Sequence, residues 1–149
     1  MAEVAVSFVF AQPIDAVWRI LRDFNSIASW LPGAVDGAIE NGLAPDQIGA
    51  IRRFTLNGAI IREKLLTLSD LDHACAYSLL EGPPSLRNMI ADFRLYEITE
   101  IGGTFGYWRA KFDVREQDRL PAMEQLQKLY SGGWSNLKKI LAGQPSLKE

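Results

Sequence analysis

At 149 residues, of which 48% are hydrophobic and 23% charged, the chain is long enough for one well-filled core and too short for two comfortable domains. Its 16 basic and 18 acidic residues are spread along the sequence and give a net charge of −2, which excludes the basic footprint of a nucleic-acid-binding protein. The single cysteine, Cys75, excludes an internal disulfide, and the lone His73 cannot assemble a Cys/His metal site. We therefore expect one domain over residues 1–149, with no metal, no cofactor and no nucleic-acid partner.

The N-terminal stretch MAEVAVSFVFAQP bears on location. It lacks the basic n-region of a secretory signal and already alternates as a strand does. No window of the sequence approaches the ~20 apolar residues of a membrane-spanning helix. We expect a cytoplasmic protein without a membrane span, either a monomer or a homodimer.

The first third of the chain predicts one strand and two helical segments. Residues 4–10 alternate as a strand, and the following stretch QPIDAVWRILRDF carries apolar residues at helical spacing, with Pro13 suited to the first turn. A second, short helical segment around SIASW should stop near Trp30, because Pro32 and Gly33 disfavour helix.

The apolar period then changes from 3.6 to 2, which predicts a run of strands separated by turn signals such as ENG, NG, SDLD, GPP and GG. The predicted strands lie near residues 35–40, 49–57, 59–69, 74–81, 87–99 and 104–115.

The last segment, DRLPAMEQLQKLYSGGWSNLKKILAG, returns to helical spacing and predicts a helix of about 22 residues, closed by Gly143 and Pro145. Its apolar stripe consists of Met123, Leu126, Tyr130, Gly133, Leu137 and Leu141. The interior pair Gly132-Gly133 has two interpretations: close packing of the helix on the sheet, or room for something else between them. The element order is β-α-α-β6-α, an α+β fold in which the long helix covers a curved antiparallel sheet of seven strands.

The dipeptide Asn57-Gly58 between alternating strands predicts a two-residue type I′ hairpin turn. Residues paired across such a turn have numbers that sum to 115, so Arg52 should face Glu63 and Phe54 should face Ile61. Parity then puts Arg52 and Glu63 on the apolar face of the hairpin. The inward faces of the later strands follow from the same alternation, and the inward face of the helix follows from its apolar stripe.

An inward guanidinium cannot lose its proton and must have a partner. Glu63 supplies one, but a carboxylate does not use all five guanidinium donors, so we expect water or a ligand oxygen nearby. The alternatives are a purely structural ion pair and a polar anchor at the end of an apolar cavity. The outward basic residues of the sheet are most simply a solvated face, with a partner surface as the lesser alternative.

These stretches together resemble the START-like superfamily, also called SRPBCC, in its polyketide cyclase/dehydratase and lipid-transport branch. The resemblance is carried by PIDAVWRILRDFNSIASWLPG, the Gly-x-x-Arg of GAIR, the Glu-basic-Leu of EKL, YSLLEG with SLRN, YWRAKFD and LYSGGWSNLKKIL. It implies a helix-grip fold, in which the sheet wraps around the C-terminal helix with an internal cavity between them.

In members similar to the lachrymatory-factor synthase, the Arg and Glu of this pattern are regarded as catalytic, and they fall on Arg52 and Glu63. In the hormone-receptor members the equivalent Glu lies in a ligand-binding water network. The chain departs from those receptors in having a tight LNGA turn in place of their gate loop, which argues against a hormone-gated lid.

Three functions remain in competition. The preferred one is a hydrophobic small-molecule-binding protein that catalyses proton transfer on a carbonyl-bearing substrate, by cyclisation, dehydration or isomerisation. The second is a non-catalytic carrier or sensor of a lipid-like ligand, and the third a chaperone-like interaction module. The predicted catalytic residues are Arg52, Glu63 and Tyr77, the last as a second donor. The predicted ligand-binding residues are Phe54, Leu56, Ile61, Leu79, Met89, Ala91, Phe93, Trp108, Ala110, Tyr130, Gly133 and Leu137.

Overall fold

The computed structural model describes residues 1–143, so the predicted helix stop at Pro145 and the end of the predicted domain lie outside the described residues. The elements in chain order are β1 (Ala2–Phe10), α1 (Ile14–Leu21), the 3-10 turn η1 (Phe24–Ser26), α2 (Ile27–Trp30), β2 (Ala34–Ile39), β3 (Ile51–Leu56), β4 (Ala59–Ser69), β5 (Ala74–Glu81), β6 (Arg87–Ile98), β7 (Gly103–Asp113) and α3 (Glu116–Leu141).

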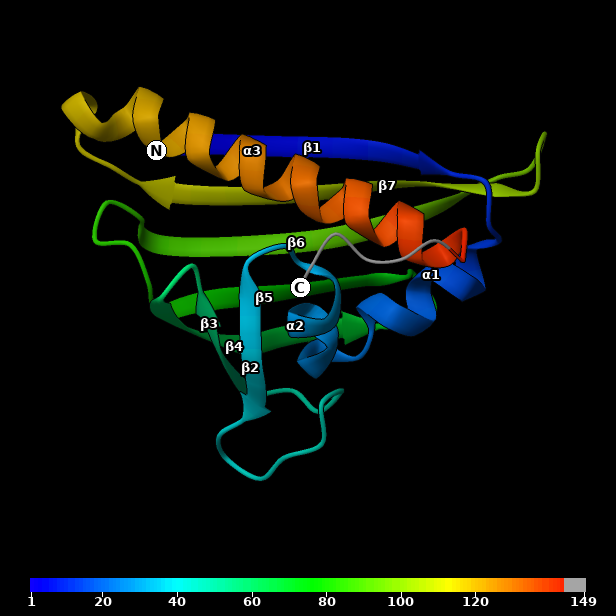
Figure 1. Cartoon of the computed structure of the whole chain (residues 1–149), viewed down its shortest axis with the longest axis horizontal. Coiled ribbons are helices and arrows are strands. Elements are labelled where there is room, and N and C mark those ends of the chain that lie inside the picture. Colours follow the sequence, from blue (N-terminus) through cyan, green and yellow to red (C-terminus); the bar gives the residue numbers. More distant parts are fainter. Residues whose placement is uncertain (144–149) are drawn as a thin grey trace.

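The strands form one antiparallel sheet in the order β1-β7-β6-β5-β4-β3-β2, so β7 pairs with the N-terminal strand and the meander of the other strands runs to β2 at the far edge. Figure 1 shows α3 lying across one face of this curved sheet, with α1 near the C-terminal end of α3 and α2 beside β2. This confirms the predicted α+β architecture with seven strands and a long C-terminal helix.

Helix α3 differs from the prediction at its start. It has 26 residues instead of about 22 and begins at Glu116, before the predicted segment, which starts at Asp118; Pro121 lies inside the helix. Pro121 is the sixth residue of the helix, so the helix lacks the hydrogen bond that a backbone N–H there would donate to the carbonyl of Gln117. The acidic residues Glu116 and Asp118 in the first turn complement the helix dipole. No helix within residues 1–143 has the length and hydrophobicity needed to cross a membrane.

The hairpin β3–β4 has the predicted register. Asn57 and Gly58 both have positive φ, 50° and 88°, as a type I′ turn requires. Arg52 pairs with Glu63 and Phe54 pairs with Ile61, so the predicted parity is confirmed and both charged side chains face the core.

An aromatic cluster fills the core between the sheet and α3. Trp108 on β7 lies 4.7 Å from the Phe93 ring on β6, 5.6 Å from Trp30 and 6.2 Å from Trp134 on α3, all between ring centroids. Aromatic pairs at such distances contribute about 0.5–1.5 kcal/mol each beyond their buried area. This cluster fills one end of the space between helix and sheet, so the remaining space lies toward the β3–β4 hairpin.

The two glycines of α3 have separate surroundings. A Cβ on Gly133 would lie 3.0 Å from Trp108 Cζ3 and 3.1 Å from both Leu31 Cδ1 and Trp30 Cζ3, so this glycine allows close packing. A Cβ on Gly132 would meet nothing within 4 Å. Each of the two predicted interpretations therefore describes one of the two residues.

Candidate functional site

The buried pair Arg52–Glu63 is the polar centre of the candidate site. Arg52 is 3% exposed and Glu63 is 5% exposed. Arg52 Nε donates a hydrogen bond of 2.8 Å to Glu63 Oε1, and Nη2 lies 2.7 Å from the same oxygen without hydrogen-bond alignment. Both Arg52 contacts therefore fall on Oε1, and neither falls on Oε2.

The rest of the guanidinium is held by η1 and the aromatic core. Arg52 Nη1 donates to the Phe24 carbonyl oxygen at 3.1 Å. The guanidinium carbon lies 4.0 Å from the centroid of the Phe24 ring and 4.6 Å from that of Tyr77, which are cation–π distances. These contacts satisfy much of the cation inside the protein.

Two tyrosines lie beside this pair. Tyr77 on β5 accepts a hydrogen bond of 2.9 Å from Trp108 Nε1. Tyr130 on α3 stacks on the Trp108 ring at 3.8 Å between centroids and an interplanar angle of 12°. Its hydroxyl is buried and has no well-formed hydrogen-bond partner among the described residues. Trp108 therefore orients both tyrosines.

An inner cavity of about 70 Å³ adjoins these side chains. Its lining is almost entirely apolar, with Glu63 and the two tyrosines as the polar exceptions. The lining residues are Ile27, Leu31, Phe54, Leu56, Ile61, Glu63, Tyr77, Leu79, Pro83, Leu86, Met89, Trp108, Leu126, Leu129 and Tyr130. This space holds a few waters or the end of a ligand, and is smaller than the ~300 Å³ of an ordinary small-molecule pocket.

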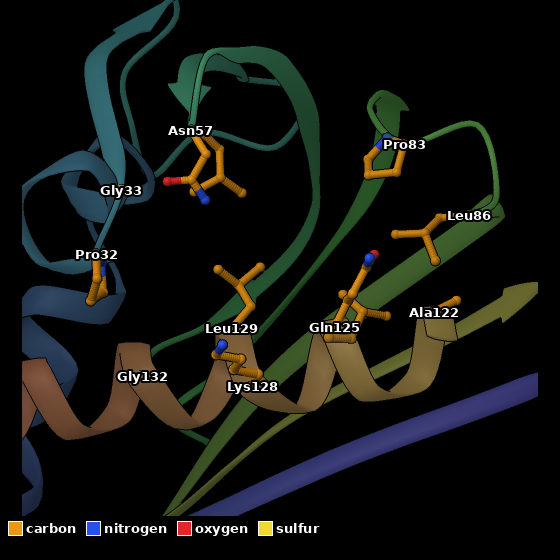
Figure 2. Close-up of a pocket in the computed structure, with 12 residues that line it drawn as sticks. Pro32, Gly33, Asn57, Pro83, Leu86, Ala122, Gln125, Lys128, Leu129 and Gly132 are labelled. Atoms are coloured by element: carbon orange, nitrogen blue, oxygen red, sulfur yellow. The ribbon is translucent and has the colours of Figure 1, made fainter. Parts of the chain in front are cut away.

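An open groove of about 640 Å³ continues this space toward solvent. Figure 2 shows that α3, with Gln125 and Leu129, forms one wall, while Asn57 and the loop with Pro83 and Leu86 form the other. The two spaces share Leu56, Pro83, Leu86, Leu126 and Leu129. Together they have the size of an ordinary small-molecule site.

Burial dominates the electrostatics of the site. It raises the pKa of the Glu63 carboxyl above its ordinary value, although the Arg52 charge acts in the opposite direction. Burial also raises the pKa of Tyr77 well above its ordinary value. A carboxyl with a raised pKa is a stronger base when ionised, so Glu63 has the properties of a proton-transfer group. Among residues 1–143, no three metal-ligating side chains lie together.

The predicted site residues divide into two groups. Those that line the inner cavity are Phe54, Leu56, Ile61, Glu63, Tyr77, Leu79, Met89, Trp108 and Tyr130. Those that line neither space are Arg52, Ala91, Phe93, Ala110, Gly133 and Leu137.

Physical reasons account for the second group. Ala91 and Ala110 are fully buried and pair across β6 and β7. Phe93 lies in the aromatic cluster and Gly133 packs against its indole rings. Arg52 lies behind Glu63 and the ring faces that cover it. An inward direction predicts burial, but the large rings decide which buried residues reach a cavity.

Several lining residues were absent from the predicted site. Leu126 was on the predicted stripe of the C-terminal helix, so its periodicity was a usable signal. Leu129 lies about one helical turn from Leu126. It was not predicted as a site residue because it is at the edge of that stripe. Pro83 and Leu86 come from the β5–β6 loop, where no periodicity indicates a face.

The curved antiparallel sheet wrapped around α3, with the cavity against the middle of the helix, defines a helix-grip protein. The model of the family described as polyketide cyclase/dehydrase and lipid transport matches residues 1–142, and the chain belongs to this family. This confirms the resemblance to the START-like superfamily. A search of curated proteins found no match.

Solved structures show the same fold. A protein named XoxI from Bacillus cereus is 23% identical, with a TM-score of 0.84, over 95% of this chain and 96% of that one. A protein from Nitrosospira multiformis is 24% identical, with a TM-score of 0.82, over 94% and 96%. A protein from Thermobifida fusca is 20% identical, with a TM-score of 0.85, over 100% and 99%. Identities this low support the fold alone.

Proposed function

We propose that the protein binds a hydrophobic small molecule with its polar end in the inner cavity and its apolar remainder in the groove. The family description supports hydrophobic ligand binding. The apolar lining and the continuity of the two spaces support this placement. A cytoplasmic location and a monomeric or homodimeric state remain predictions.

We further propose that Glu63 transfers a proton on a carbonyl-bearing ligand. The observation that carries this proposal is that Glu63 lines the cavity while both Arg52 contacts fall on Oε1. Oε2 takes a proton from the carbon next to the carbonyl, and the electron pair of that C–H bond forms an enolate. The Tyr77 hydroxyl donates to the enolate oxygen, and Glu63 returns the proton to a carbon of the ligand.

Arg52 has a positioning role in this scheme. The expectation that it holds the ligand oxygen is not supported by the lining of the cavity, which does not include it. Its bonds to Glu63 and to the Phe24 carbonyl fix the carboxylate in one orientation. We therefore propose that Arg52 acts through Glu63.

The carrier function is the second candidate. It is favoured by the small volume of the inner cavity, about 70 Å³, and by the absence of Arg52 from its lining. In this case Glu63 and Tyr77 orient a polar end without reacting with it.

One experiment separates these functions without knowledge of the natural ligand. Methyl octyl ketone is incubated with the protein in D₂O, and exchange of the protons next to its carbonyl is followed by NMR, while binding is measured by calorimetry. If the protein is a catalyst, the wild type should accelerate proton exchange on the ketone. Glu63→Gln should still bind the ketone but should not accelerate the exchange. Glu97→Gln, which changes an exposed carboxylate on β6, is the matched control.

The outcomes are distinct. Binding without exchange by the wild type favours the carrier. If neither the ketone nor any apolar molecule retained in native mass spectrometry binds, the pocket proposal is wrong and an interaction module gains support.

A further inference from the structure

The Tyr77 hydroxyl has a fixed hydrogen-bond direction. The indole Nε1–H of Trp108 is a donor only, so in their 2.9 Å hydrogen bond the Tyr77 oxygen is the acceptor. The hydroxyl proton is therefore left to donate elsewhere. Since Tyr77 lines the inner cavity, an oxygen bound there is a candidate acceptor for this proton, as is the neighbouring Tyr130 hydroxyl.

The Tyr130 hydroxyl is the second unusual group. The residue is 2% exposed, and its ring is held by the stack on Trp108. A buried hydroxyl without a well-formed hydrogen bond is uncommon, and the polar group that interacts with this one, the Tyr77 hydroxyl, does not have hydrogen-bond geometry toward it. Tyr130 lines the same cavity as Tyr77, from the opposite wall formed by α3.

Both hydroxyls remain protonated near neutral pH. Burial raises the pKa of Tyr130 far above its ordinary value, the Glu63 charge raises it further, and the neighbouring Tyr77 hydroxyl lowers it in part. Burial likewise raises the pKa of Tyr77. Both side chains are therefore hydrogen-bond donors in the working state of the protein.

The charges around the cavity disfavour an anion. Glu63 is the one charged residue in its lining, and Arg52 is already engaged by Glu63 and by ring faces. Lys128, a cation in the lining of the outer groove, does not line the inner cavity. A ligand carboxylate placed between the tyrosines would meet the negative charge of Glu63 with no free cation beside it.

We propose that Tyr77 and Tyr130 form a two-donor site for a single uncharged ligand oxygen, so that the protein selects apolar ketones, aldehydes or alcohols over fatty-acid carboxylates. Trp108 is the positioning residue, because it turns the Tyr77 proton toward the cavity and holds the Tyr130 ring. This inference rests on the proposed binding function, since it names the ligand class of the same cavity.

The test compares three probes with the same number of carbons: methyl octyl ketone, decanoate and decane. Their affinities for the wild type, Tyr130→Phe and the control Tyr96→Phe are measured by calorimetry. Tyr96 is 45% exposed on the sheet and lies outside the cavity lining. Loss of one neutral hydrogen bond predicts that Tyr130→Phe weakens ketone binding roughly fivefold, while decane and decanoate binding stays unchanged.

A spectroscopic readout detects the hydrogen bonds themselves. The infrared carbonyl stretch of the isotope-labelled ketone should shift to lower frequency on binding to the wild type, and part of this shift should be lost in Tyr130→Phe and in Trp108→Phe. Loss of the frequency shift in Trp108→Phe would show that Trp108 positions Tyr77, because a phenylalanine ring has no N–H to donate to the Tyr77 hydroxyl.

The outcomes of this test separate the two proposals. If no probe binds, the binding function itself is wrong. If the ketone and decane bind but Tyr130→Phe binds the ketone as tightly as the wild type, the two-donor site is wrong and binding stands. Equal losses for ketone and decanoate in Tyr130→Phe would also overturn the selectivity for an uncharged oxygen.

Discussion

Arg52 on β3 donates from Nη1 to the carbonyl oxygen of Phe24, 28 positions earlier in the sequence. The same guanidinium contacts Glu63 on β4 and the faces of Phe24 and Tyr77. One side chain thereby joins the turn after α1 to two strands and to the edge of the cavity. A change at Arg52 should affect fold stability and site geometry together.

The coupling of Arg52 and Glu63 is testable by a double-mutant cycle. Arg52→Met leaves a buried carboxylate without its cation and should lower the free energy of unfolding by about 3–5 kcal/mol. The double variant Arg52→Met/Glu63→Leu removes both charges and should recover most of this loss. Urea denaturation gives the values. Asp118→Asn, in the exposed pair Arg115–Asp118, should cost no more than about 1 kcal/mol. Additive effects of the two changes would contradict a coupled buried pair.

Gly132 and Gly133 should respond oppositely to alanine. Gly132→Ala meets open space and replaces a poor helix former, so it should stabilise the protein by about 0.5–1 kcal/mol. Gly133→Ala places a methyl group 3.0–3.1 Å from Trp108, Trp30 and Leu31. Overpacking of this kind costs about 1–3 kcal/mol, which exceeds the gain in helix propensity. Thermal denaturation gives the Tm of both variants. Equal shifts of Tm would show that the indole rings move to make room for the added methyl group.

The raised pKa of Glu63 predicts how its contribution to stability varies with pH. A carboxyl whose folded pKa lies above its unfolded value stabilises the protein below that unfolded value, about 4.5, and the contribution is lost as the pH rises through the folded pKa. The free energy of unfolding of the wild type, minus that of Glu63→Gln, should therefore fall from acidic toward neutral pH. Glu97→Gln, which changes an exposed carboxylate on β6, is the control variant measured over the same pH range. A difference that rises with pH would mean that the Arg52 charge lowers the pKa of Glu63 by more than burial raises it.

Cys75 should be inert in the native protein. Burial raises the pKa of its thiol to about 12, so almost none of the reactive thiolate is present at pH 8. Iodoacetamide should label Cys75 slowly in the folded state and quickly in urea, as measured by intact mass spectrometry. Fast native labelling would show that β5 opens to solvent readily.

The sequence predicted the fold well where local signals are strong. The Asn57-Gly58 turn fixes the hairpin register, and alternation then gives the inward residues of the neighbouring strands. Helix α3 was predicted too short, at about 22 residues within a segment starting at Asp118, although it has 26 residues and begins at Glu116.

The candidate site was predicted less completely than the fold. Sequence alternation identifies which residues face inward, and so it found Arg52 and Glu63. It does not show how the indole rings of Trp30, Trp108 and Trp134 share the interior, and their packing decides where space remains. The hydroxyl direction of Tyr77 likewise depends on Trp108, which is 31 residues away in sequence.

The two-residue turn at Asn57-Gly58 also bears on the rate at which a ligand exchanges. The groove opens beside this turn, and a connection of that length has no residues to fold over the opening. Entry then requires no preceding closure or opening of the hairpin. In stopped-flow experiments the observed rate of binding should rise linearly with ligand concentration, without the plateau that a slow conformational step imposes. Residence times would then be set by the depth of burial of the ligand.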